Sequence, residues 1–231
     1  MTGGVFSKLW GVYERLLAAT ESTAAQSNVG TVRRPQSLSG RFRRDQQGIV
    51  FECVIVLENW RWRASKTNEK VTIVVHVQES LTADGNTLQR STVRVSYFAA
   101  RDNNADWLHT VHFDFGPQQA CHPTFHAQLT EEAVIPSGQD AAELGCDVMF
   151  GTREGRCFKN ARIPTSDMTF SSVLLCLAAD HIRAEFFSQF KAEIVQIQRD
   201  MPMPNYDPAM KQSLQADVTR IGSSHWFAHV S

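Results

Sequence analysis

The sequence has little net charge, few cysteines and no long hydrophobic run. Its formal net charge is −1, which argues against a protein whose whole surface binds nucleic acid through positive charge. The five cysteines are widely spaced and form no CxxC pair, which favours reduced thiols over a disulfide framework or a zinc ribbon. No stretch approaches about 18 consecutive apolar residues, and the N-terminus lacks the pattern of a secretory signal. We therefore expect a cytoplasmic protein without a membrane span.

Sequence motifs that specify a chemistry are also missing. The segment GTREGR at 151–156 matches neither GxGxxG nor the phosphate-binding motif GxxxxGK[ST]. There is no GxSxG, and no cysteine lies in a recognisable nucleophile context. The sequence therefore indicates no particular cofactor, and any site has to be built from residues that folding brings together.

The chain is long enough to form one complete hydrophobic core. It has 231 residues, of which 42% are hydrophobic, and we interpret it as a single domain of five segments. The segments are an N-terminal amphipathic helix at 1–27, an Arg-rich linker at 28–47, an antiparallel sheet at 48–130, an acidic irregular insertion at 131–160 and C-terminal helices at 161–231.

Local patterns predict the elements within these segments. Five runs rich in β-branched and aromatic residues, separated by turn residues, predict a meander of about five antiparallel strands. The runs occupy residues 48–60, 70–80, 90–99, 105–115 and 123–130. Helical spacing of apolar residues then predicts one long helix of about 30 residues within 162–200, with His181 as a hydrogen-bonded core histidine, and a shorter helix near 207–221. The expected class is α+β, with an antiparallel meander sheet packed against the N-terminal helix and the long C-terminal helix.

This layout is similar to that of helix-grip folds, in which a long C-terminal helix lies against a curved antiparallel sheet around an apolar cavity. The combination of HFDF at 112–115, HPTFHAQL at 122–129, RIPTSDM at 162–168 and LLCLAADH at 174–181 also resembles sequences of bacterial proteins. Neither resemblance implies an activity or the role of any residue, because a fold does not determine a function.

Residues 112–129, HFDFGPQQACHPTFHAQL, contain three histidines and one aspartate within two predicted strands. The odd-numbered positions of both strands, from Trp107 onward, are mostly apolar, so the apolar faces match only if odd positions oppose odd positions. This pairing places the polar, even-numbered positions together on one face. They include His112, Asp114, His122 and His126.

Distance limits what these four residues can do together. His122 and His126 are roughly 13 Å apart along one strand, too far to share a metal ion, whereas His112 can reach one of them across the strands. A site with two histidines and one carboxylate, or a proton-transfer pair, is compatible with this geometry. An enzyme built on it would be a hydrolase, with or without a divalent metal ion. The alternatives are a polar binding surface and a solvated strand face, and Pro123, typical of an edge strand, favours the last.

Positive charge is concentrated in the first third of the chain. Residues 1–70 contain 11 Lys and Arg against 6 Asp and Glu, and the remainder contains 12 against 18. The candidate contacts for a partner are Arg33, Arg34, Arg41, Arg43, Arg44, Arg61 and Arg63. Arginine binds phosphate and tryptophan stacks on bases, so WRWR at 60–63 is typical of a site for single-stranded nucleic acid. Strand alternation instead favours buried Trp60 and Trp62, with the arginines in solvent.

We therefore predict a non-enzymatic, cytoplasmic binding module that docks a protein or a single-stranded nucleic acid through an exposed sheet face or the Arg-rich segment. A homodimer contact is an alternative use of the N-terminal helix. One alternative function is the hydrolase. The other is a small-molecule carrier with an apolar pocket under the long C-terminal helix, which a cavity of a few hundred cubic ångström would support. Its predicted lining is drawn from Leu177, Phe186, Phe187 and Phe190.

Overall fold

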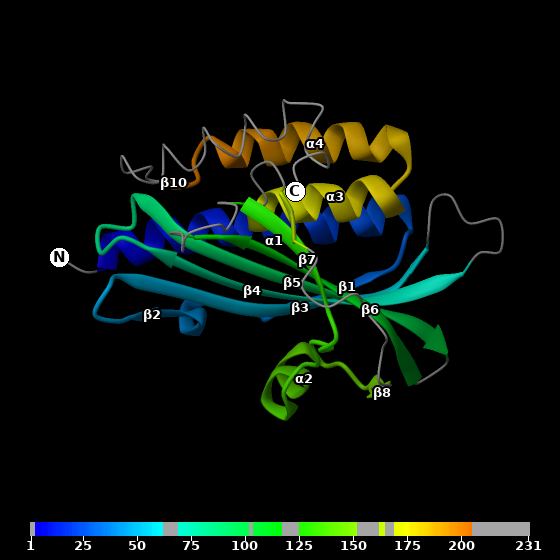
Figure 1. Ribbon diagram of the computed structural model, residues 1–231. Helices are drawn as coiled ribbons and strands as arrows, with labels where there is room; N and C mark the ends of the chain where they lie inside the picture. The colour runs from blue at the N-terminus through cyan, green and yellow to red at the C-terminus, as the bar shows by residue number, and fades with distance from the viewer. Residues whose placement is uncertain are drawn as a thin grey trace, which may run out of the picture.

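The computed structural model describes residues 3–61, 69–101, 104–116, 125–151, 162–164 and 169–204. Within these residues a ten-stranded sheet carries helices α1, α3 and α4 on one face and α2 on the other (Figure 1). We call the first the helix-covered face and the second the open face. The predicted α+β class, with an antiparallel sheet and helices from both ends of the chain, is confirmed.

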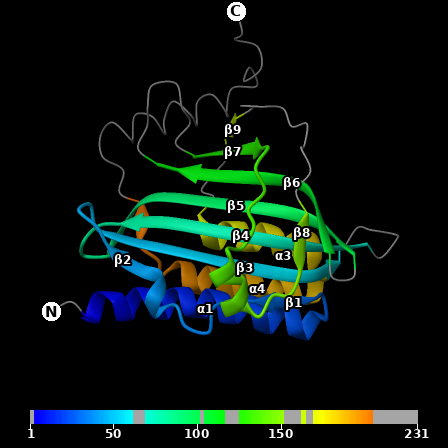
Figure 2. The ribbon, with the colours of Figure 1, turned by 90° about the horizontal axis from the view of Figure 1, so that it is seen from below.

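The five predicted strands form the centre of the sheet in consecutive antiparallel order (Figure 2). They are β3 (Ile49–Arg61), β4 (Lys70–Leu81), β5 (Thr87–Arg101), β6 (Asn104–Phe115) and β7 (Phe125–Thr130). Three short strands, β1 (Thr31–Arg33), β2 (Phe42–Arg44) and β9 (Arg162–Pro164), add antiparallel pairings at β3 and β7. Two others, β8 (Met149–Gly151) and β10 (Met203–Pro204), pair in parallel with β6 and β5.

The helices are α1 (Gly3–Ser27), α2 (Gly138–Leu144), α3 (Phe170–His181) and α4 (Ala184–Gln198), with a 3-10 turn at Ser39–Arg41. The segment predicted to be irregular contains α2, which begins where the Ser137 side chain accepts a hydrogen bond from the Asp140 N–H. The helix predicted near 207–221 lies outside the described residues. No helix in the described part of the chain combines the length and apolar character needed to cross a membrane.

The single long helix predicted over 162–200 is two helices in the structure. Ile182 and Arg183 have extended backbones, with ψ values of 142° and 150°, and the Ile182 side chain is fully buried. Gln198 Nε2 at the end of α4 donates a hydrogen bond to Ser171 Oγ at the start of α3 over 3.2 Å. The two helices therefore lie side by side and antiparallel. The turn returns the apolar face of α4 to the core. The periodicity of the sequence does not indicate this break, because apolar residues recur at helical spacing on both sides of it.

A buried carboxylate joins the sheet to two helices on the helix-covered face. Glu79 on β4 is 0% exposed. It accepts hydrogen bonds from the Tyr13 hydroxyl of α1, from Ser91 Oγ on β5 at 2.8 Å and from the Phe170 N–H at the first residue of α3 at 3.3 Å. The position of Glu79 therefore links α1 and α3 to the same point of the sheet.

The register of β5, β6 and β7 decides which side chains share a face. In the β6–β7 hairpin Val111 opposes Leu129 and Asp114 opposes His126, which confirms the predicted odd-to-odd pairing. On the other side of β6 the register shifts between Tyr97 and Phe98, and Leu108 has no partner on β5. This bulge turns Trp107 onto the open face, where it packs in a hydrophobic cluster with Phe98 and Leu144. Placing Trp107 on the same face as Val111 was therefore wrong.

Candidate functional site

The predicted histidine cluster is assembled on the open face around Asp114. His112 Nε2 lies 3.0 Å from Asp114 Oδ1, and His126 Nε2 lies 3.6 Å from Asp114 Oδ2. Thr92 Oγ1 donates a hydrogen bond to Asp114 Oδ1 at 2.7 Å. His126 is buried, 4% exposed, and His122 lies outside the described residues. Three of the four predicted residues are thus in contact.

The electrostatics of this cluster favour an ionised carboxylate. Burial raises the pKa of Asp114, but the adjacent His112, the Thr92 hydroxyl and His126 lower it by more, so that the pKa lies below its ordinary value of 3.8. A carboxylate of low pKa orients imidazole rings and is a weak general base at neutral pH. Within the described ranges, no group of three or more His, Cys, Asp or Glu side chains has the geometry to hold a metal ion. The hydrolase stays a prediction.

The predicted arginine cluster is largely neutralised by carboxylates of the same chain. The pairs are Arg33 with Glu58 at 2.9 Å, Arg34 with Glu14 at 2.9 Å and Glu21 at 3.0 Å, Arg41 with Asp140 at 2.9 Å and Glu143 at 2.5 Å, and Arg43 with Glu52 at 3.4 Å. The guanidinium of Arg44 lies over the Phe6 ring, 5.4 Å from its centroid. Arg61 is exposed, and Arg63 lies outside the described residues.

These pairs balance the charge asymmetry of the sequence. Asp140 and Glu143 belong to α2, in the acidic segment, and bind Arg41 in the basic segment. Internal pairing weakens the field that this surface offers to a polyanion. Trp60 is buried, 1% exposed, as strand alternation predicts, while Trp62 lies outside the described residues. Nucleic-acid binding through this segment stays a prediction.

A cavity of 270 Å³ lies on the helix-covered face, between α3 and strands β5 and β6. We call it the α3 cavity. Its apolar lining consists of Val95, Val111, Phe113, Val173 and Leu177, and its polar lining of Tyr97, His109, Cys176 and Asp180. Apolar walls with a few polar groups directed to one space are typical of small-molecule sites.

Two stacked rings form the polar floor of the α3 cavity. Tyr97 and His109 are cross-strand partners, with ring centroids 4.7 Å apart and planes inclined by 19°. Burial lowers the pKa of His109. Burial also raises the pKa of Tyr97, and the Asp180 carboxylate and Cys176 raise it further. Both rings are therefore neutral near pH 7, so that the floor offers hydrogen-bonding groups without charge.

A second histidine supports this floor from the core. His181 is 3% exposed, and its Nδ1 donates a hydrogen bond to the Arg61 carbonyl at 2.9 Å, which confirms the predicted core histidine. Its ring stacks on Tyr97 at 6.4 Å and contacts Trp60 edge to face at 5.7 Å. Burial lowers the pKa of His181, an effect larger than the opposing contributions of the Arg61 carbonyl and Asp180.

The partly buried His109 and the buried His181 predict that stability falls in mild acid. Their ordinary pKa is 6.5 and the folded values are lower, so below pH 6.5 the unfolded chain binds protons that the folded protein does not. We expect the free energy of unfolding, measured with urea, to be smaller at about pH 5.5 than at about pH 7.5. His109→Phe keeps a ring on Tyr97 and removes one titrating group. The decrease in unfolding free energy between the two pH values should therefore be smaller in this variant. An identical loss in wild type and His109→Phe would contradict this account.

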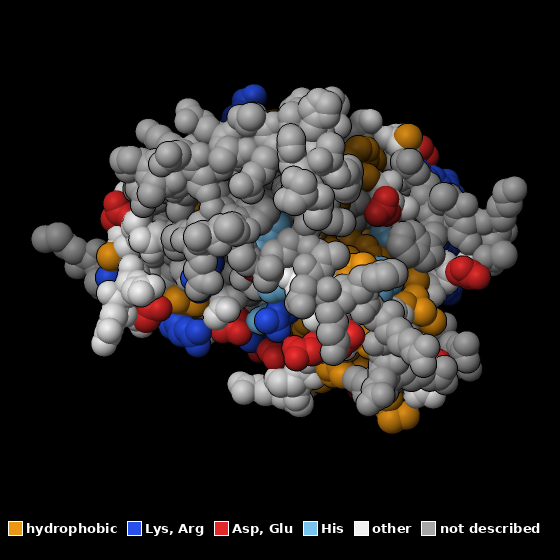
Figure 3. Space-filling view, in the orientation of Figure 1, with side chains coloured by type: hydrophobic (Ala, Val, Ile, Leu, Met, Phe, Trp, Pro, Cys, Tyr) orange, Lys and Arg blue, Asp and Glu red, His pale blue; other side chains and the backbone are white. Residues whose placement is uncertain are grey.

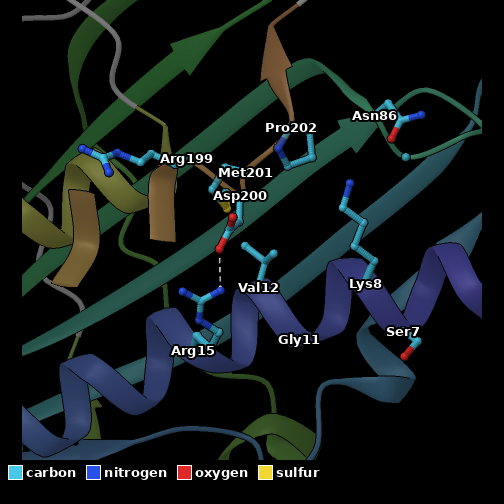
Figure 4. A pocket seen from close by; sticks show the side chains of 11 residues that line it. Ser7, Lys8, Gly11, Val12, Arg15, Asn86, Arg199, Asp200, Met201 and Pro202 are labelled. Carbon is cyan, nitrogen blue, oxygen red and sulfur yellow. Dashed lines mark hydrogen bonds and ion pairs between the residues drawn. The ribbon is translucent and has the colours of Figure 1, made fainter. Parts of the chain in front are cut away.

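A polar cleft of 520 Å³ lies between α1 and the segment that follows α4. Figure 4 shows Arg15 of α1 paired with Asp200 across it, at 2.6 Å, and Lys8 extending toward Asn86 and Pro202. Arg15, Lys8, Asn86 and Asp200 are all exposed. The lining of this cleft is therefore more polar than that of the α3 cavity.

Sequence reasoning found only part of the cavity lining. Of the four predicted residues Leu177 alone lines it; Phe190 is fully packed in the core, and Phe186 and Phe187 are partly buried against that core. The turn after α3 directs these phenylalanines elsewhere. His109 could have indicated the site from the sequence. It lies at an odd-numbered position of its strand, like Val111 and Phe113, and is thus a polar residue on an apolar strand face.

Comparisons of the chain with protein-family models, with curated protein sequences and with solved structures find no match, and its function is therefore inferred from geometry alone.

Proposed function

We propose that this protein is a non-enzymatic binding protein that holds a small, uncharged, largely apolar molecule in the α3 cavity. The observation that carries the proposal is the cavity itself, 270 Å³ of space with an apolar wall and a neutral aromatic floor. Ligand pockets usually measure about 300–1,000 Å³, and this cavity is slightly smaller, so we expect a ligand smaller than a typical drug-sized molecule. The cavity lies beneath α3, the first of the two helices that replace the predicted long C-terminal helix.

The chemistry of the lining supports binding in preference to catalysis. Tyr97 and His109 are held in their neutral forms, as described above. Partial burial raises the pKa of the Cys176 thiol, and the Asp180 carboxylate raises it further, which makes this cysteine a weak nucleophile at neutral pH. The polar groups therefore suit hydrogen bonds that orient a ligand. The cytoplasmic location, the bacterial source, the homodimer and the nucleic-acid partner stay predictions.

Filling the cavity should weaken the binding of an uncharged probe. Val111→Trp places a large ring at the partly buried wall of β6, and we expect it to weaken binding of N-phenyl-1-naphthylamine, followed by fluorescence, by at least about tenfold. The matched control is Val195→Trp, at an exposed position of α4, which should bind as the wild type does. Equal affinities for all three proteins would refute the proposal.

The exposed Cys176 thiol gives a second readout of the same site. Cys53 and Cys146 are buried and Cys176 is exposed among the described free cysteines. In a Cys121→Ser, Cys157→Ser background, the probe should slow the reaction of Cys176 with a thiol reagent, because Cys176 lines the cavity. Saturating probe that leaves the reaction rate unchanged would mean that the probe binds elsewhere.

A further inference from the structure

A guanidinium group that makes no ion pair among the described residues lies on the open face, on the central strand β5. Arg94 on β5 is partly buried, and within the described residues it makes no ion pair. This contrasts with Arg33, Arg34, Arg41 and Arg43, each of which binds a carboxylate. Partial burial of an unpaired charge is unfavourable, so the position is suited to a group that arrives from outside the chain.

Arg94 lies between two histidines in one row across the sheet. Its cross-strand partners are His76 on β4 and His112 on β6, and opposite Cβ atoms in such pairs are about 4.5–5.5 Å apart. The three side chains line a cavity of 140 Å³, which Thr130, Glu132, Ala133 and Val134 also line. Figure 3 shows histidine, basic and acidic side chains next to one another near the middle of the molecule. We call this space the Arg94 cavity.

The wall of the Arg94 cavity is anchored to the sheet. The Val134 N–H donates to Ser96 Oγ at 2.8 Å, and Ser96 Oγ is hydrogen-bonded to Thr110 Oγ1 at 2.7 Å. Trp107 Nε1 also donates to Thr110 Oγ1, at 3.0 Å. Hydrogen bonds to buried polar groups thus hold the segment that carries Glu132 against the sheet, and they fix the wall of the cavity.

The charges around the cavity define the ligand. Glu52 is bound to His76 at 3.1 Å and to Arg43 at 3.4 Å, and Asp114 lies 3.0 Å from His112. The Glu132 carboxylate is exposed, and within the described part of the chain it pairs neither with Arg94 nor with another cation. A simple anion at Arg94 would be repelled by Glu132, whereas a ligand with both charges would satisfy both residues.

We infer that the Arg94 cavity binds a small zwitterion, an α-amino acid with a small side chain, whose carboxylate contacts Arg94 and whose ammonium group contacts Glu132. The planar guanidinium offers two parallel N–H donors to a carboxylate. The volume of 140 Å³ and the neighbouring Ala133 and Val134 suit a short apolar side chain. This site is independent of the α3 cavity, which lies on the other face of the sheet.

Calorimetric titration with three matched probes tests the inference. L-Alanine carries both charges, propionate lacks the ammonium group and ethylamine lacks the carboxylate. We expect L-alanine to bind with one-to-one stoichiometry in the millimolar range or tighter, and each of the other two to bind at least about tenfold more weakly. Absence of L-alanine binding, or propionate binding of equal strength, would overturn the inference.

Variants assign the two charges to the two ends of the ligand. Arg94→Gln should weaken L-alanine binding at least about tenfold. Glu132→Gln should weaken the binding of L-alanine and strengthen the binding of propionate, because it removes the carboxylate that repels an anion. Arg90→Gln, at an exposed position of β5 outside the cavity, is the control and should bind as the wild type does. Equal effects of Arg94→Gln and Arg90→Gln would overturn the inference. Arg94→Gln should still bind N-phenyl-1-naphthylamine, so the two sites are tested separately.

Discussion

Replacing Glu79 with alanine is expected to lower the free energy of unfolding by about 3–5 kcal/mol. The reason is that buried donors from three elements lose their common acceptor: the Tyr13 hydroxyl, the Ser91 hydroxyl and the Phe170 N–H. An unsatisfied buried donor costs about 1–3 kcal/mol, and the three costs overlap because the site can relax.

The position of Glu79 explains this sensitivity. Its carboxylate lies at the N-terminus of α3, where a negative charge interacts favourably with the helix dipole by about 0.3–1 kcal/mol. Tyr13 is fully buried, and burial followed by the charge of Glu79 raises the pKa of Tyr13 well above its ordinary value. The tyrosine therefore remains a hydrogen-bond donor. Loss of the carboxylate would loosen α1 and α3 together, since both are attached at this point.

Urea unfolding of two glutamate variants provides the comparison. Glu193→Ala, at an exposed position of α4, should change the free energy of unfolding by less than about 0.5 kcal/mol. Glu79→Gln keeps one acceptor oxygen but removes the charge, and should fall between Glu79→Ala and the wild type. If Glu79→Ala were as stable as Glu193→Ala, the hydrogen bonds at Glu79 would not hold the helices.

Replacing Trp60 with alanine is expected to cost about 3–5 kcal/mol of unfolding free energy, the usual cost of removing a buried aromatic side chain. Trp60 is 1% exposed, its ring packs on His181, and its Nε1 donates to the Thr31 carbonyl of β1 at 3.2 Å. The substitution would leave a void in the core and remove the attachment of β1. It would also leave His181 with less support behind the floor of the α3 cavity.

Trp10 offers a matched control for this prediction. It is 40% exposed on α1, and its Nε1 donates to Glu14 Oε1 on the same helix at 2.9 Å. Trp10→Ala should cost no more than about 1 kcal/mol, measured by the same urea unfolding. Similar losses for Trp10→Ala and Trp60→Ala would show that Trp60 contributes no more than a surface side chain.

Local patterns in the sequence predicted most of the fold. The five central strands were recognised because runs of β-branched and aromatic residues are separated by short groups of turn residues. The structure places β3 to β7 at those runs. The pairing of Asp114 with His126 across the β6–β7 hairpin followed from the alternation of apolar and polar residues along each strand. Each of these features depends on interactions between neighbours in the chain or across one tight turn.

Other parts of the sites depended on the register of several strands at once. The row of His76, Arg94 and His112 crosses three strands, and it required the pairings of both β4 with β5 and β5 with β6. Those pairings contain register shifts next to Ser80 and Tyr97. A bulge changes which residues share a face, and nothing in the alternation of a single strand reveals it.

The sequence by itself determined the α+β class, the meander of central strands and the gathering of His112, Asp114 and His126 on one face, because these follow from side-chain periodicity. Only the tertiary structure decided three other features. It divides the C-terminal helix at Ile182, pairs Arg41 with acidic residues about a hundred positions away in the chain, and leaves the α3 cavity beside His109. Each of them arises from packing between segments distant in sequence, where burial and charge pairing act between side chains whose separation along the chain carries no signal.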